Sequence, residues 1–154
     1  MSAGERAIID AIKAQFGGLI APGAYDLVDD AAMIPPVVGD RSRVITTDVV
    51  VEGVDFDRAL YPIAYAGFRA LAQNVSDVAA MGGAAAGFVW SLAIPASWST
   101  SDVAELARGA AILAKLRKVP LFGGDLSSTH GPLVCSVTAF GDVMGRPVRR
   151  SGAK

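Results

Sequence analysis

The sequence predicts a single α/β domain in which helices pack against a sheet of moderate size. Its 154 residues lie within the usual size of one domain. Patterns typical of helices and strands follow one another in the order α-β-α-β-α-β-β, with no internal repeat and no low-complexity segment. Apolar residues make up 52% of the chain and charged residues 19%, which excludes general disorder.

The first helix is predicted over residues 5–16, because Ile8, Ile12 and Phe16 recur at the spacing of one helical face. Gly17-Gly18 ends it. The following stretch to residue 42 is rich in proline and glycine, so it is predicted to be mostly loop, with one short strand around residues 32–34.

The middle of the chain predicts a strand, a helix and a second strand. Residues 44–51 are β-branched almost throughout, as in a strand buried on both faces. Pro62 suits the start of a helix that is rich in alanine and leucine, and Gly82-Gly83 closes it after Met81. Residues 86–94 form another apolar strand, which Pro95 ends.

The last third predicts one helix and two strands. A serine or threonine at positions 99–101 caps a helix that continues to about residue 117. A short strand over residues 119–122 leads into Gly123-Gly124-Asp125, and a long strand covers residues 132–143. A basic tail over residues 146–154 follows.

Several classes of function are excluded. The formal charge of −1 argues against a nucleic-acid module, and no run of about 18 apolar residues predicts a membrane helix. Neither a P-loop nor a dinucleotide fingerprint occurs, and a single histidine, His130, leaves nucleophilic schemes without a base. Cys135 lies in an apolar strand and is expected to be buried and inert. Since no apolar signal core follows Met1, we expect a cytoplasmic setting.

Aspartates in unusual places carry the remaining chemistry. Taken singly, Asp29-Asp30, Asp48 and Asp125 each suit a turn, a cap or a strand end. Asp77 does not, because it interrupts an apolar helix one turn from its C-terminus, where the helix dipole disfavours an anion. We therefore expect Asp77 in a packed setting, where a divalent cation would offset the cost of burying a carboxylate.

Neighbouring residues suit magnesium and phosphate. Thr46 and Asp48 lie two apart on a strand and share a face, whereas Thr47 points the other way. Hydroxyl and carboxylate oxygens are ligands that suit Mg²⁺. Gly123-Gly124 allows a backbone to approach a phosphate, and Arg149-Arg150 offers guanidinium donors. Together these features indicate metal-assisted phosphoryl transfer, and a phosphate acceptor would need no general base.

Read in order, these residues resemble the thiamine-monophosphate kinases, members of the aminoimidazole-ribonucleotide-synthetase-like superfamily of ATP-binding proteins. The match spans nearly the whole chain in six short blocks. The blocks are Val28-Asp29-Asp30-Ala31-Ala32, Thr46-Thr47-Asp48 continuing to Val51-Glu52-Gly53-Val54, Asn74-Val75-Ser76-Asp77-Val78-Ala79-Ala80-Met81-Gly82, Gly123-Gly124-Asp125, Ser136-Val137-Thr138-Ala139, and Gly145-Arg146 through Arg150-Ser151-Gly152-Ala153-Lys154.

The resemblance implies ATP-dependent conversion of thiamine monophosphate to thiamine diphosphate with several Mg²⁺ ions, without a catalytic acid or base from the protein. Gly123, Gly124 and Asp125 are implied to contact the nucleotide, and Arg150 its phosphates. Asp55 stands where the family usually has a histidine that approaches the substrate, so it is the candidate substrate residue. The implied metal-binding set is Asp30, Thr46, Thr47, Asp48, Asp77 and Asp125.

The resemblance also implies the architecture. Residues 1–154 would form the family's N-terminal domain, with a mixed, mostly antiparallel sheet, helices on one face, and the sheet paired with that of a second subunit in a homodimer. The family's second domain, which supplies part of the substrate site, would be absent, so the chain alone would be weakly active or inactive. Two alternatives remain: a non-catalytic dimerisation module, and a related ATP-dependent enzyme of selenophosphate synthesis, hydrogenase maturation or purine synthesis.

Overall fold

The computed structural model describes residues 3–27, 34 and 37–149. Of the strand predicted around residues 32–34 only Ile34 is described, and it belongs to no strand. The order of the remaining elements confirms the predicted one. The elements are α1 (Ala3–Phe16), the 3₁₀ helices η1 (Gly17–Leu19) and η2 (Pro22–Leu27), β1 (Arg41–Val51), α2 (Ile63–Ala80), β2 (Ala84–Pro95), α3 (Thr100–Arg117), β3 (Leu121–Thr129) and β4 (Val134–Met144).

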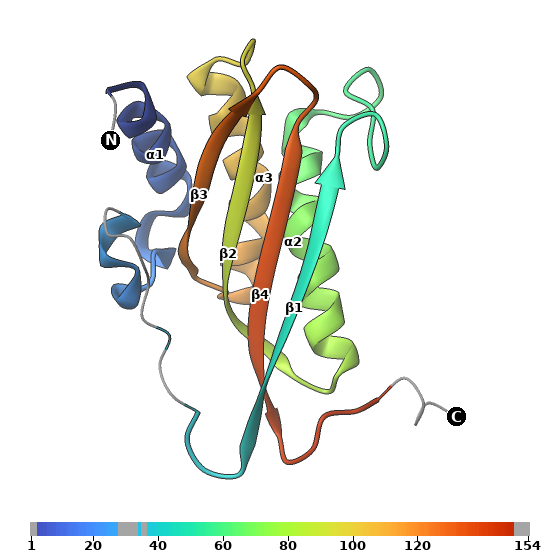
Figure 1. Cartoon of the computed structure of the whole chain (residues 1–154). Helices are drawn as coiled ribbons and strands as arrows, with labels where there is room; N and C mark the ends of the chain where they lie inside the picture. The colour runs from blue at the N-terminus through green and yellow to red at the C-terminus, as the bar shows by residue number, and fades with distance from the viewer. Residues whose placement is uncertain (1–2, 28–33, 35–36, 150–154) are drawn as a thin grey trace.

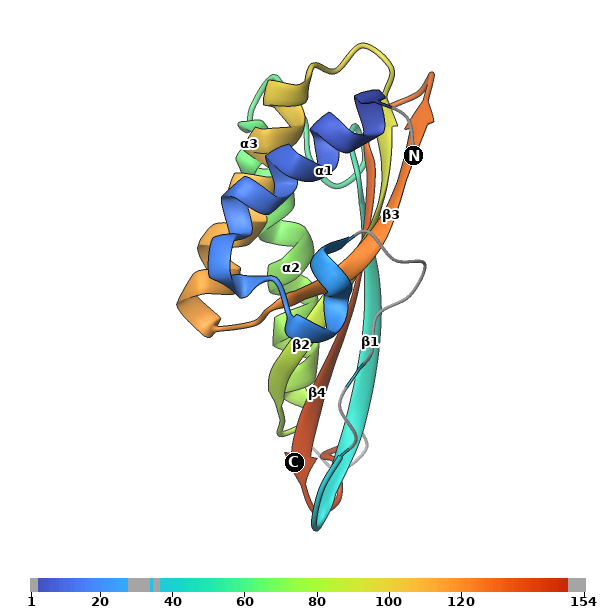
Figure 2. The same ribbon diagram turned by 90° about the vertical axis from the view of Figure 1, so that its left-hand side faces the viewer.

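The strands form one four-stranded sheet in the order β1-β4-β2-β3 (Figure 1). β4 pairs antiparallel with both β1 and β2, and β2 pairs parallel with β3, so the sheet is mixed and mostly antiparallel. α1, α2 and α3 all lie on the same side of the sheet (Figure 2). This confirms the predicted fold class. In the described part of the chain, no helix has the length and apolar character needed to span a membrane.

The main core lies between the helices and the sheet. Apolar residues alternate along β4 so that Cys135, Val137 and Ala139 all have no exposed surface. Phe16 of α1 meets the ring of Trp90 of β2 edge to face, with centroids 6.0 Å apart. The helices therefore cover one face of the sheet with a continuous apolar layer. A polar side chain on this face of the sheet lies close to the core.

α2 and α3 pack closely because each helix places a glycine against the backbone of the other. A Cβ on Gly67 of α2 would stand 2.0 Å from the carbonyl oxygen of Leu106, and one on Gly109 of α3 would stand 1.8 Å from that of Ala64. No side chain fits at either point. The two glycines thus set the separation of the helices and, through it, the position of α2 over β1.

α3 begins at a capping box, as its serine-rich start predicts. The Ser99 hydroxyl accepts a hydrogen bond from the backbone N–H of Asp102, whose carboxylate in turn accepts one from the Ser99 backbone. These hydrogen bonds from Ser99 lower the pKa of the Asp102 carboxyl, with a smaller contribution from Arg58. The helix ends at Lys118, whose φ of 56° is left-handed.

β3 is longer than predicted. The short strand expected over residues 119–122 continues to Thr129, so Gly123-Gly124-Asp125 lies within the strand and not after it. Its register with β2 shifts between Phe88 and Val89, which face Leu121 and Gly123, so that Phe122 is an extra residue in β3. Gly123 has a φ of 157°, which side chains rarely tolerate.

The face of the sheet away from the helices is only partly covered. Phe122 and Phe140 meet there with centroids 5.0 Å apart, and Ala21 and Ala24 from the η2 region pack on them. Further along the same face, Ile45 of β1 is 68% exposed and Val49 is 48% exposed. We call this surface the open face.

Candidate functional site

Thr46 and Asp77 join β1 to α2. The Thr46 hydroxyl donates a hydrogen bond of 3.0 Å to Oδ2 of Asp77 across the gap between strand and helix. The expectation of a packed Asp77 was wrong, because its side chain is exposed although Val78 beside it is buried. The carboxylate therefore points along the edge of the helix–sheet interface, where a cation from solvent can reach it.

Asp48 lies on the same face of β1 as Thr46, as predicted. It is paired with Val137, whose side chain is in the core between helices and sheet. Two residues along a strand advance it by about 7 Å. Asp48 is half-buried, and no hydrogen bond or ion pair to its carboxylate is found among the described residues. We call the surface formed by Thr46, Asp48 and the adjoining face of α2 the β1–α2 seam.

Thr47 lies on the open face, as its position in the strand predicts. Its hydroxyl donates to the carbonyl oxygen of Val137 and accepts from the hydroxyl of Thr138, at 3.1 and 2.9 Å. Both of these partners belong to β4. Thr47 therefore ties two strands together, and its side chain faces away from the β1–α2 seam.

Asp125 is separated from the seam. It is paired with Ser91 of β2, one residue on from Trp90, which is in the core, so the side chain of Asp125 points to the open face. Its strand is also the edge opposite β1. Within one chain the structure places Thr46 against Asp77, with Asp48 next on the same face of β1, and it places Asp125 elsewhere. No three acidic, histidine or cysteine side chains among the described residues are grouped to hold a metal.

The two glycines of the predicted nucleotide-binding segment have structural reasons to be glycine. Gly123 is at the bulge, and a Cβ on Gly124 would stand 2.0 Å from the carbonyl oxygen of Trp90. Gly124 is nevertheless exposed along its strand, as is Asp125. Their role toward a nucleotide stays a prediction, and Asp30 and Arg150 lie outside the described residues.

Asp55, the candidate substrate residue, supports a turn. Its Oδ2 accepts a hydrogen bond of 2.8 Å from the backbone N–H of Val51, at the end of β1. Its Oδ1 lies 3.9 Å from the guanidinium of Arg69 on α2, and Arg69 also donates to the Asp55 carbonyl oxygen. Both contacts draw the carboxylate toward the protein. A contact between Asp55 and substrate stays a prediction.

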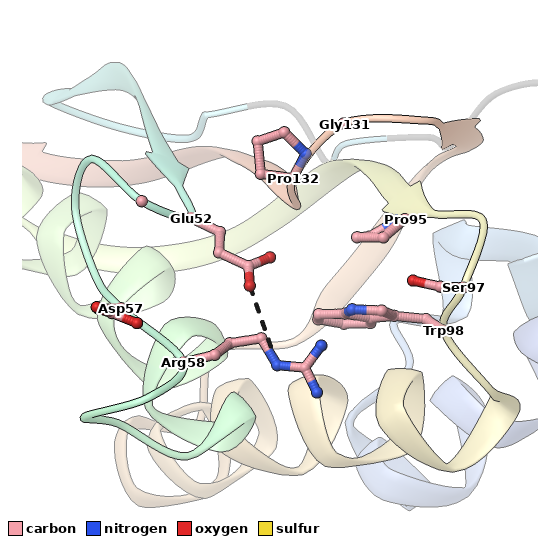
Figure 3. Close-up of a pocket in the computed structure, with 9 residues that line it drawn as sticks. Glu52, Asp57, Arg58, Pro95, Ser97, Trp98, Gly131 and Pro132 are labelled. Atoms are coloured by element: carbon pink, nitrogen blue, oxygen red, sulfur yellow. Dashed lines mark ion pairs between the residues drawn. The ribbon is translucent and has the colours of Figure 1, made fainter.

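An open pocket of about 400 Å³ lies at the end of the sheet where β1 and β2 finish. The Arg58 guanidinium lies over the ring of Trp98 at 5.1 Å from its centroid, and 4.0 Å from the Glu52 carboxylate (Figure 3). None of the predicted metal or nucleotide residues lines it. Its three acidic neighbours, Glu52, Asp57 and Asp102, outnumber Arg58, so it does not suit a phosphate.

His130 and Cys135 follow the sequence predictions. His130 is exposed in the turn between β3 and β4. Cys135 is fully buried, and burial raises the pKa of its thiol to about 12. A thiol with that pKa stays protonated at neutral pH, so Cys135 is not a nucleophile.

Gln73 and Asn74, which lie one turn before Asp77 on α2, were not predicted to be site residues. Asn74 has no exposed surface and is the one buried polar side chain in the described part of the chain. Its Oδ1 and the Oε1 of Gln73 are buried without a hydrogen-bond partner. The signal was present in the sequence, since two amides precede Asp77 in an otherwise apolar helix.

The β1–α2 seam fits a divalent cation. It presents the carboxylates of Asp48 and Asp77 and the hydroxyl of Thr46. One turn before Asp77 on α2, two buried amide oxygens have no donor. Mg²⁺ takes oxygen ligands and is commonly held by one or two carboxylates, retaining several waters. Such a cation would be bound by Asp48 and Asp77, with Thr46 fixing the orientation of Asp77.

Comparison with known proteins decides the family. Residues 28–143 match the model described as AIR synthase related protein, N-terminal domain. The chain belongs to this family. The matched AIR synthase related domain contains every candidate site residue named above except Arg149 and Arg150.

Curated relatives of this AIR synthase related domain are thiamine-monophosphate kinases. The chain is 41% identical over 127 residues to that of Synechococcus elongatus, covering 82% of this chain and 38% of the relative. It is 39% identical to that of Bacillus subtilis, covering 82% and 39%. It therefore spans about two-fifths of the length of the curated relatives that it matches.

Solved structures agree with this similarity. The thiamine-monophosphate kinase of Stenotrophomonas maltophilia superposes with a TM-score of 0.75 at 35% identity, over 97% of this chain and 46% of that one. AaThiL, solved in complex with AMPPCP and TMP, gives 0.70 at 30%, over 98% and 45%. A hydrogenase maturation protein HypE with ATP gives 0.75 at only 18%, over 93% and 41%, which shows a shared fold.

Proposed function

We propose that this chain is the nucleotide- and magnesium-binding part of a thiamine-monophosphate kinase. In the whole enzyme it would serve ATP-dependent transfer of a phosphoryl group to thiamine monophosphate, giving thiamine diphosphate. The observation that carries the proposal is the β1–α2 seam, in which the Thr46 hydroxyl holds the carboxylate of Asp77 and the unpaired Asp48 follows two residues later on the same face of β1. The similarity to thiamine-monophosphate kinases at 39–41% identity supports the substrate class.

The residues of the seam would hold the metal in place and would take no part in bond making or bond breaking. Asp48 and Asp77 would bind the metal through their oxygens, and the Thr46 hydroxyl would keep Asp77 from rotating toward solvent. The metal, when bound, supplies neutralisation of phosphate charge. Because the acceptor of the transfer is itself an ionised phosphate oxygen, no side chain needs to remove a proton, which agrees with the exposed His130 and the buried, protonated Cys135.

Nucleotide binding by the chain tests the proposal directly. Millimolar ATP with Mg²⁺ should raise the melting temperature, because a ligand that binds only the folded state stabilises it. Asp77→Ala should remove most of that rise. Since Asp77 is exposed, the variant should melt within a few degrees of the parent without ligand. No rise with the parent chain, at any Mg-ATP concentration up to millimolar, would contradict the proposal.

The second domain is expected to be needed for turnover. With thiamine monophosphate and Mg-ATP, the 154-residue chain should form little or no thiamine diphosphate, whereas a version extended to the length of the relatives should form it. A stable chain that binds no nucleotide would instead favour the non-catalytic dimerisation module.

We also propose a homodimer formed through the open face. The exposed Ile45 and Val49 give β1 an apolar surface that a second copy of the sheet can cover. Ile45→Lys should shift the mass measured by light scattering from twice the chain mass to once. A parent chain that is monomeric at about 100 μM would contradict the proposed homodimer, because even weak dimers form at concentrations of this order.

A further inference from the structure

Two buried amide oxygens of α2 have no donor. Asn74 has no exposed surface; its Nδ2 donates to the carbonyl oxygen of Ala70 at 2.9 Å, while its Oδ1 accepts nothing. Exchanging the two atoms would place oxygen against oxygen, so the Ala70 contact fixes the orientation of the amide. The Oε1 of Gln73 is buried and unpartnered as well. An unsatisfied buried acceptor costs about 1–3 kcal/mol, so two in succession need a physical reason.

Both amides lie on α2 one turn before Asp77. Residues three and four apart on a helix are neighbours on its surface, so Asn74 and Gln73 flank the line that leads back along α2 from Asp77, with Asn74 on the buried side and Gln73 half-buried. Figure 1 shows β1 and α2 side by side and running in opposite directions. Thr46 is level with Asp77, to which it donates a hydrogen bond. Moving along β1 from Thr46 to Asp48 therefore runs in the same direction as moving along α2 from Asp77 to Gln73 and Asn74.

The seam thus gathers acceptors with almost no donors. The carboxylates of Asp48 and Asp77 and the two amide oxygens accept hydrogen bonds, and among the described residues only the hydroxyl of Thr46 donates to any of them. A hydrated divalent cation supplies what is missing, because its water ligands are strong donors and need acceptors around them.

We propose that Asn74 and Gln73 are positioning residues that accept hydrogen bonds from the water shell of the divalent cation held by Asp48 and Asp77. The inference rests on the metal part of the proposed function and extends it to two side chains outside the carboxylate set. The amides touch the cation only through its water, so they fix its place along the seam and do not neutralise its charge.

Asn74→Leu tests the inference, with Mn²⁺ as the probe. Leucine has the branching and heavy-atom count of asparagine, although it is bulkier, and it removes the unsatisfied acceptor together with the donor to Ala70. Thermal unfolding in EDTA checks that the variant folds. Titration of the free Mn²⁺ spin signal should show 10- to 100-fold weaker binding, as for other outer partners of metal ligands. Gln73→Leu should act in the same direction, and Ser76→Ala, on the exposed side of α2, should change neither measurement.

The outcomes distinguish a failure of the two amide roles from a failure of the metal site. If the parent chain binds Mn²⁺ and both leucine variants bind it equally well, the two amides are only structural and the inference is overturned while the metal site stands. If the parent chain binds no Mn²⁺ up to millimolar concentration, the inference and the metal part of the proposed function are both overturned. Should Asn74→Leu fail to fold, Gln73→Leu, at a half-buried position, decides between the same results.

Discussion

Gly109 of α3 lies against the backbone of Ala64 of α2 so closely that a Cβ would stand 1.8 Å from the Ala64 carbonyl oxygen. Alanine is the better helix former by about 1 kcal/mol, yet Gly109→Ala should destabilise the fold by about 2 kcal/mol or more, because the helices must separate. Urea unfolding measures the change. Gly4→Ala in α1, where nothing lies within 4 Å, is the control and should be neutral or stabilising.

Asp55→Ala should destabilise the turn after β1. It leaves the partly buried N–H of Val51 without its acceptor and removes a partner of Arg69, at a cost of about 1–3 kcal/mol. Asp57→Ala removes a similar hydrogen bond, which the Asp57 carboxylate accepts from the N–H of Ala59. Because this bond is exposed, its loss should cost less than about 1 kcal/mol. Equal losses in the two variants, measured by denaturant unfolding, would show that the Asp55 contacts stabilise the turn no more than the exposed Asp57 hydrogen bond does.

Thr46→Val should weaken Mg-ATP binding while leaving the fold nearly unchanged. Its hydrogen bond to Asp77 is exposed, so stability should fall by at most about 1 kcal/mol. Without it Asp77 is free to rotate, and affinity should fall about 10-fold. Thr138→Val removes a hydroxyl on the open face and serves as the control. Calorimetric titration of both variants gives the comparison, and a matching loss with Thr138→Val would count against the seam.

Stability should fall at alkaline pH because of Cys135. Its thiol ionises near 9.0 when unfolded and at about 12 when folded, so below pH 9 both states are protonated and nothing changes. Between these two values the unfolded state binds fewer protons, and stability falls by about 1.4 kcal/mol per pH unit from this group. Cys135→Ala should flatten the pH profile by that slope. Parallel profiles for parent and variant would place the thiol in contact with solvent.

Much of the fold follows from local pattern. The apolar spacing of α1, the β-branched run of β1 and the serine-rich start of α3 each specify their element within a few residues. The length of β3 does not, because Gly123-Gly124 has the composition of a turn. Pairing with β2 overrides that preference, and the close approach of Gly124 to Trp90 is invisible until both strands are placed.

The candidate site was predictable only where local sequence pattern determines the position of a side chain. That Thr46 and Asp48 share a face follows from the two-residue period of a strand, and the structure confirms it. The exposure of Asp77 could not be predicted, because apolar neighbours on a helix do not reveal where the edge of the covered face falls. The separation of Asp125 from Asp48 depends on the strand order and on a bulge, and neither leaves a local signal.

The bulge at Phe122 decides which face of the sheet the later side chains of β3 occupy. Because Phe122 has no partner of its own in β2, Gly123 faces Val89 and Asp125 faces Ser91. In a regular strand of the same sequence Phe122 would face Val89, every later residue would shift by one position, and each later side chain would change sides. Asp125 would then face Leu92 and project among the buried groups beneath the helices, and Leu126 would project into water. One residue taken up in a bulge thus keeps a charge outside and a hydrocarbon inside.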